Sequence, residues 1–167
     1  MPHAPQSAKK LREATFFLDH MRAIWPTAML ADESFDFFLS AFLAAARSVT
    51  LVLQAEQKVA YDAWFPGWGD ALPSDEKGLL KFLKNERNDI LKVGVTSRDA
   101  TTEPMPALEF MTRSAAANLE QFSFDPQAMI LVNHYYFDVD GARRPVIEVC
   151  SDGVRVLQRL LDAFGAE

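Results

Sequence analysis

Residues 35–53 read FDFFLSAFLAAARSVTLVL, and this stretch decides the fold that we expect for the chain. It is apolar on almost every side of a helix, and the alanines at 44–46 allow a second helix to approach closely. Asp32 is the expected N-cap, and the helix is expected to run to about Glu56. The stretch falls just short of a comfortable membrane span and polar residues interrupt it, so we expect a core helix at the centre of a bundle. The interrupting residues are Asp36, Ser40, Arg47 and Ser48.

Two further long helices are predicted in the first half of the chain. After Ser7 the apolar residues follow one helix face with three-four spacing, and Pro26 ends that helix. Ser74 begins the other, which Gly94 ends in the position that favours a left-handed backbone. The aromatic stretch 61–68 is broken by proline and glycine, so we expect a bend there whose aromatic side chains fold back onto the bundle.

The second half of the chain has a different character. Residues 96–106 are rich in serine, threonine and proline and predict a loop. Residues 129–137 are dense in apolar, β-branched and aromatic side chains and predict a strand. Asp140-Gly141 then predicts a two-residue hairpin turn, and residues 146–149 are expected to form the returning strand.

A last helix and one more short strand complete the prediction. Ser151 is the expected N-cap of the helix, which ends at Gly165, and residues 108–112 are assigned to the extra strand. The chain is therefore predicted to be mainly α, an up-and-down helical bundle with a small β-hairpin insert before the last helix. We expect a single domain over 1–167, with a helical core at 7–94, a loop-rich connection at 95–126, a β-hairpin at 127–149 and a closing helix at 151–165.

Composition and charge exclude several classes of protein. Of the 167 residues 49% are hydrophobic, which is enough to bury a core and excludes a disordered or fibrous chain. The 23 acidic residues outnumber 17 basic ones, and the net charge of −6 argues against nonspecific binding of nucleic acid. The single cysteine, Cys150, excludes an internal disulfide framework and is read as a core residue. No signal peptide pattern opens the chain, so we expect a cytoplasmic protein.

Two arginines break the apolar pattern of the predicted helices. Arg87 lies within the apolar arc of its helix, beside Glu86, and Arg47 lies on a narrow polar seam of the central helix. An unpaired buried charge is severely unfavourable, so both arginines are expected to have partners. The main hypothesis is a structural polar network, and the alternative is that Arg87 lines a groove and binds an anion. The seam consists of Asp36, Ser40, Arg47 and Gln54, and the expected network of Asp36, Ser40, Arg47, Glu86 and Arg87.

The same residues carry a resemblance to a known family. The succession SAFL at 40–43 and AARSVT at 45–50, then Trp64, then residues 82–88 ending in Glu86-Arg87-Asn88, resembles HEPN-like helical proteins. The resemblance covers residues 10–95 and the closing helix. It implies an up-and-down helical bundle and a homodimer, in a family many of whose members are metal-independent ribonucleases.

The nuclease motif of that family is incomplete in this chain. Arg87 and Asn88 match its start, but the positions expected to hold histidine are Lys92, Val93 and Gly94. Cleavage through the 2′-hydroxyl of RNA needs a group that exchanges a proton near neutral pH, as imidazole does. An ordinary lysine stays charged there and is a poor base. The departure therefore favours a HEPN-like fold with a degenerate site.

A second candidate site is aromatic. We expect Trp64 and Trp68 to line a cleft between bundle and hairpin together with His134, Tyr135 and Tyr136 of the predicted strand. For the last three residues, a sheet face packed on the helices is the favoured explanation. The three histidines of the chain are too scattered to form a metal signature, so no metal and no cofactor are predicted.

Three functions follow from these sites. The first is a non-catalytic binding or assembly module, acting as a homodimer with a possible protein partner. The second is an atypical ribonuclease that uses Arg87, Asn88 and Lys92, and it is the only hypothesis that makes RNA a partner. The third is binding of a small ligand in the aromatic cleft. No membrane partner is expected under any of the three.

Overall fold

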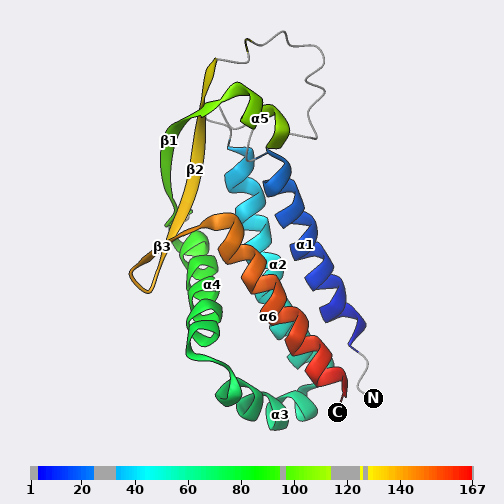
Figure 1. Cartoon of the computed structure of the whole chain (residues 1–167). Helices are drawn as coiled ribbons and strands as arrows, with labels where there is room; N and C mark the ends of the chain where they lie inside the picture. The colour runs from blue at the N-terminus through cyan, green and yellow to red at the C-terminus, as the bar shows by residue number, and fades with distance from the viewer. Residues whose placement is uncertain (1–3, 25–32, 95–96, 114–124, 126–127, 167) are drawn as a thin grey trace.

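The computed structural model describes residues 4–24, 33–94, 97–113, 125 and 128–166, and over these it is mainly helical with a small antiparallel sheet (Figure 1). The predicted fold class is confirmed. The elements follow the chain as α1 (Pro5–Ile24), α2 (Ser34–Glu56), α3 (Lys58–Ala71), α4 (Ser74–Val93), β1 (Asp99–Pro106), α5 (Ala107–Arg113), β2 (Met129–Val139), β3 (Ala142–Pro145) and α6 (Val146–Ala166).

Helix α2 is the centre of the bundle, as its apolar sequence predicts. It packs against α1, α3, α4 and α6, and α1 runs beside both α2 and α6 (Figure 1). Its side chains Phe35, Leu39, Phe42, Leu43 and Val49 are almost completely buried. By length and composition this helix is sufficient to cross a membrane, so the expected shortfall was wrong. Its packing inside the bundle is what supports a core helix.

Helix α3 corrects the bend expected over the aromatic stretch. Tyr61, Trp64, Phe65 and Trp68 recur with the three-four spacing of one helix face, and the helix continues through Pro66. All four rings lie against Phe164 or one another, in a cluster that also includes Leu53 and Leu160. Burial of these aromatic side chains outweighs the low helix propensity of proline and glycine.

The sheet has the order β1-β2-β3, with both pairs antiparallel. Asp99 lies opposite Tyr136 and Pro106 opposite Met129, so β1 occupies residues expected to form a loop. Two prolines at 104 and 106 do not prevent this, because β1 is an edge strand and its outer side needs no hydrogen bonds to a neighbour. The loop-rich connection expected over 95–126 is therefore corrected to contain a strand.

The predicted hairpin turn is confirmed, and the strand after it is shorter than expected. Asp140 and Gly141 have φ values of 53° and 79°, as a two-residue hairpin turn requires. The returning strand β3 ends at Pro145, so residues 146–149 form the first turn of α6 and not a strand. Proline lacks the N–H that would continue a ladder and is well tolerated where a helix begins.

Three other local predictions are corrected. Residues 108–112 lie in helix α5 and not in a strand. Ser7 and Ser151 lie inside α1 and α6 and do not cap them, while Ser74 is the first residue of α4 and not its N-cap. Gly94, with φ of 82°, ends α4 as predicted. The expected N-cap Asp32 and the helix end at Pro26 lie outside the described residues.

Candidate functional site

The polar network predicted from the sequence is divided among separate partners. Asp36 pairs with Arg98, whose Nη2 lies 2.5 Å from Oδ2. The guanidinium of Arg98 also lies 4.3 Å from the centroid of the Tyr135 ring. The hydrogen bonds that Arg98 donates to Asp36 raise the pKa of Arg98. Arg98 is 62 residues from Asp36 in sequence, and no helical spacing points to it, so the sequence missed it.

The Glu86 carboxylate is buried and also has a partner that was not expected. Only 4% of Glu86 is exposed, and it accepts hydrogen bonds from the Ser97 backbone N–H at 3.1 Å and the Ser97 hydroxyl at 2.5 Å. It thereby holds the chain just after α4. Arg87, the expected partner, donates instead to its neighbour Asn88 over 3.3 Å. Ser40 lies half-buried on α2. The five residues therefore do not form one network.

The residues matched to the nuclease motif are only partly together. Arg87 and Asn88 are hydrogen-bonded to each other and half-buried on α4, whereas Lys92 is exposed. Five residues of helix rotate the chain through about 500°, which places Lys92 roughly 140° around α4 from Arg87. The three residues do not share one helix face.

The aromatic cleft expected between bundle and hairpin does not form. Trp64 and Trp68 stack on each other in α3, with ring centroids 5.7 Å apart, at one end of the bundle (Figure 1). Residues 134–136 lie on β2 beside the opposite end. There Tyr135 is buried and stacks on Phe35 at 4.1 Å. The two halves of the proposed cleft are therefore separate.

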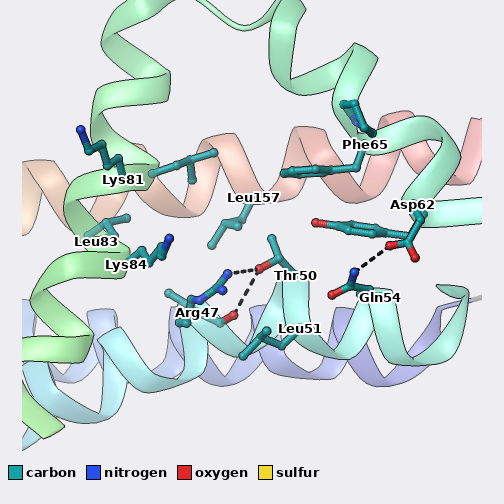
Figure 2. A pocket seen from close by; sticks show the side chains of 14 residues that line it. Arg47, Thr50, Leu51, Gln54, Asp62, Phe65, Lys81, Leu83, Lys84 and Leu157 are labelled. Carbon is teal, nitrogen blue, oxygen red and sulfur yellow. Dashed lines mark hydrogen bonds between the residues drawn. The ribbon is translucent and has the colours of Figure 1, made fainter.

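The structure presents a different pocket, of about 520 Å³, between α2, α3, α4 and α6 (Figure 2). Its wall combines cationic, aromatic and aliphatic side chains. The lining residues on which the argument depends are Arg47, Thr50 and Leu51 of α2, Tyr61, Asp62 and Phe65 of α3, Lys81 and Lys84 of α4, and Leu157 of α6.

One side of this pocket is cationic. Arg47 is half-buried, and its Nη1 donates to the Thr50 hydroxyl over 2.8 Å. Lys84 and Lys81 line the same pocket from α4, and Figure 2 shows Lys84 on the facing helix, on the same side as Arg47. Among the described residues no carboxylate forms an ion pair with any of these three cations. This arrangement leaves positive charge available to a ligand.

The other side of the pocket is aromatic, and the carboxylate of Asp62 on that side is already paired. The rings of Tyr61 and Phe65 stack with centroids 4.7 Å apart. Burial raises the pKa of Tyr61 to about 12, and the Arg47 charge offsets part of that rise. Asp62 accepts a hydrogen bond from Lys58 and another from Gln54 over 2.7 Å, and the two bonds lower the pKa of Asp62.

The polar seam predicted on α2 was therefore informative in part. Arg47 and Gln54 both line the pocket, while Asp36 pairs elsewhere. The sequence marks Tyr61 and Phe65 as aromatic residues, but they lie in the same pocket as Arg47 only because residues 58–71 form a helix. Lys81 and Lys84 gave no signal, because exposed lysines on a helix are common.

Two other features bear on chemistry. In the part of the chain that is described, no group of three or more His, Cys, Asp and Glu side chains has the arrangement of a metal site. Cys150 is completely buried in α6, and burial raises the pKa of its thiol far above the usual range. A buried thiol of this kind is unreactive, which confirms the core interpretation of Cys150.

Comparison of the chain with family models, with curated proteins and with solved structures finds no match. The residues of the pocket therefore carry the functional information.

Proposed function

We propose that this chain is a non-catalytic, HEPN-like binding module that holds a small anion in the pocket between α2, α3, α4 and α6. The observation that carries the proposal is the half-buried Arg47, which faces this pocket and has the Thr50 hydroxyl as its described hydrogen-bond partner. Lys81 and Lys84 add positive charge from the facing helix. In a protein with a net charge of −6, such a cluster of unpaired cations is a local exception.

The energetics of burial support this proposal. A guanidinium group removed from water needs a carboxylate or several acceptors, because an uncompensated charge there is unfavourable. Arg47 has five N–H donors, and one hydroxyl satisfies only part of them. A ligand anion would accept two parallel hydrogen bonds from the planar fork, which is the strongest arrangement available to arginine.

The ribonuclease alternative receives no comparable support. Asn88 occupies one side of Arg87, and Lys92 is exposed on a different face of α4. The described lining of the pocket contains no histidine, so it offers no imidazole for proton transfer. Binding without catalysis is the function that these contacts favour.

The experiment that tests the proposal is a survey of anions against the purified chain. Phosphate, sulfate, benzoate and 2-naphthoate would be added in turn, and the shift of melting temperature and the tryptophan fluorescence measured. Trp64 and Trp68 report on the pocket because they share α3 with Tyr61 and Phe65. We expect at least one anion to stabilise the fold, since a ligand that binds only the native state raises its stability.

Variants at two basic residues make the survey specific. Arg47→Gln should abolish the stabilisation, whereas Lys9→Gln should leave it intact, because Lys9 is exposed on α1 and outside the pocket. Both changes remove one positive charge, so the nonspecific electrostatic effect is matched. Equal loss in the two variants, or no response to any anion, would refute the proposal.

Three expectations from the sequence stay predictions. The homodimer is implied by the resemblance to HEPN-like proteins, and the protein partner and the cytoplasmic location are likewise expectations. Light scattering on the eluting peak of a sizing column would measure the mass of the particle. A mass of one chain, 18.7 kDa, at micromolar concentration would contradict the homodimer.

A further inference from the structure

The pocket also indicates which kind of molecule bears the anionic group. We infer that its ligand is an aryl monocarboxylate, with the carboxylate on Arg47 and a flat apolar body against Phe65, Tyr61 and Leu157. This inference rests on the proposed function, because it assigns the ligand class of the same pocket. Three observations support it: the shape of the cationic group, the aliphatic and aromatic wall, and the placement of negative charge.

The cationic side suits one planar anionic group. Arg47 offers the only partly buried guanidinium fork in the described pocket wall, and its Nη1 is positioned by Thr50. The two lysines are exposed and flexible point charges. Phosphate chains are commonly held by several backbone N–H groups at a glycine-rich turn or a helix N-terminus, and the described wall is made of helix sides. A single carboxylate matches the fork in geometry and charge.

The rest of the wall is apolar and offers a flat surface. Leu51, Leu83 and Leu157 add aliphatic surface to the pocket, and Figure 2 shows Leu157 between Arg47 and Phe65 (Figure 2). The stacked Tyr61 and Phe65 rings provide aromatic surface, on which aryl groups prefer offset or edge contacts. Pockets for small molecules are lined mainly by such side chains and have volumes of about 300–1,000 Å³. The observed 520 Å³ lies in that range.

Negative charge at the far side limits the ligand to one anionic group. Asp62 lies with Phe65 and Gln54 on the side away from Arg47 (Figure 2). Its oxygens are engaged by Lys58 and Gln54, so it has little need of a ligand cation. A second carboxylate or a phosphate on the ligand would meet a like charge there, which costs affinity. The pocket therefore suits a ligand that carries negative charge at one end only.

A set of matched probes tests the ligand class. Binding of 2-naphthoate, 2-naphthamide and inorganic phosphate to the full chain would be measured by calorimetry. We expect 2-naphthoate to bind at least about tenfold more tightly than either of the others, since it alone combines a charged acceptor with an aryl body. Arg47→Gln should weaken 2-naphthoate by about tenfold or more, and Lys9→Gln should leave its affinity unchanged.

A second pair of variants tests the aromatic wall. Phe65→Leu should weaken 2-naphthoate by about threefold by removing the stacked ring. The control is Phe16→Leu, at an exposed phenylalanine of α1 that lies outside the pocket. Circular dichroism of both variants would establish that they are folded before affinities are compared.

The outcomes separate this inference from the proposed function. If phosphate binds as tightly as 2-naphthoate and both depend on Arg47, the ligand class is wrong but the anion-binding module stands. If 2-naphthamide binds as tightly as 2-naphthoate, Arg47 does not recognise charge, and both proposals fail. If none of the probes binds, the proposed function itself is overturned. Tight binding of 2-naphthoate alone, with dependence on both Arg47 and Phe65, supports both.

Discussion

Near its N-terminus α2 carries Asp36 in an ion pair with Arg98, whereas nearer its C-terminus the side chain of Arg47 has the Thr50 hydroxyl as its partner among the described residues. Both sites lie on the polar seam that the sequence predicts. At the first site the charges neutralise each other, and Arg98 is further covered by the Tyr135 ring. At the second, the guanidinium faces a pocket. A polar residue in a core helix therefore becomes structural or functional depending on which side chains from distant segments of the chain contact it.

The largest effect is expected at the paired site. Arg98→Met should destabilise the fold by about 2 kcal/mol, because it removes a two-bond ion pair and a cation–π contact while keeping an apolar stem. The arginine is 19% exposed and the carboxylate 40%, so solvent screening keeps the loss below that of a fully buried pair. Urea unfolding followed by circular dichroism measures the change.

The matched variant at the other site is Arg47→Gln. It removes a charge that has no described carboxylate partner, so we expect a change in stability of less than about 0.5 kcal/mol. A loss at Arg47 as large as that at Arg98 would show that Arg47 is also structural. The contrast between the two helix ends would then disappear.

A carboxylate can be supplied to Arg47 from within the chain. In Leu51→Glu the new side chain lies one helical turn after Arg47 on α2, within reach of an ion pair. We expect anion affinity to fall by about tenfold, because the internal carboxylate competes for the guanidinium. The melting temperature should stay the same or rise slightly. Calorimetry with 2-naphthoate measures the first effect and a thermal scan the second.

A neutral change at the same position separates charge from shape. Leu51→Gln has nearly the size of Leu51→Glu but carries no charge. It should retain most of the affinity, since 44% of Leu51 is exposed to begin with. Loss of binding in both variants would point to a steric cause and would leave the role of Arg47 unsupported.

The extent to which sequence predicted these features has a physical explanation. Local patterns were reliable where one helix or one turn is sufficient, as for α2 and the Asp140-Gly141 turn. They failed where contacts between distant segments determine the structure. Asp36 finds its partner 62 residues away, and the β1 strand exists because β2 pairs with it. Neither contact leaves a trace in nearby sequence.

Helix α3 is a failure of a different kind. Tyr61, Trp64, Phe65 and Trp68 have the spacing of one helix face, so the information was present in the sequence. The proline and glycine between them indicate a bend, whereas the spacing indicates a helix, and a helix is what forms. Because α3 supplies the aromatic wall, the same error placed the candidate aromatic site in the wrong part of the molecule. The seam residue Arg47 was the part of the site that sequence could find.

Alkaline pH provides a test of the pocket from the protein side alone. Tyr61 holds its proton until about pH 12 in the folded chain, but near pH 10.0 in the unfolded chain. The unfolded state therefore binds fewer protons above pH 10, and stability falls as pH rises from 10 to 12. The two pKa values give a loss of about 1 kcal/mol at pH 10.5. Unfolding measured at several pH values, with Tyr61→Phe as the reference that lacks this loss, determines it.

The two arginines should affect this titration differently. The positive charge of Arg47 lowers the pKa of Tyr61, so Arg47→Gln should raise that pKa further. Arg98→Met should leave it unchanged, because Arg98 contacts Asp36 and Tyr135 and not the pocket. Absorbance of tyrosinate near 295 nm, corrected with Tyr61→Phe, follows the titration. An unchanged titration in Arg47→Gln would contradict the placement of Arg47 beside the aromatic wall.

The smallest effect is expected from the hydroxyl that positions Arg47. Thr50→Val keeps the shape of the side chain but removes the acceptor for the guanidinium, which water can replace because both residues are only half-buried. If Thr50 holds the Arg47 guanidinium in position, affinity for 2-naphthoate falls about threefold in this variant. The free energy of unfolding changes by less than about 0.5 kcal/mol. Thr15→Val is the control, since the Thr15 hydroxyl on α1 donates to the Leu11 carbonyl and lies outside the pocket.

Thr50 acts only through Arg47, so combining Thr50→Val with Arg47→Gln should weaken binding no more than Arg47→Gln alone. Additive losses would instead place Thr50 in direct contact with the anion.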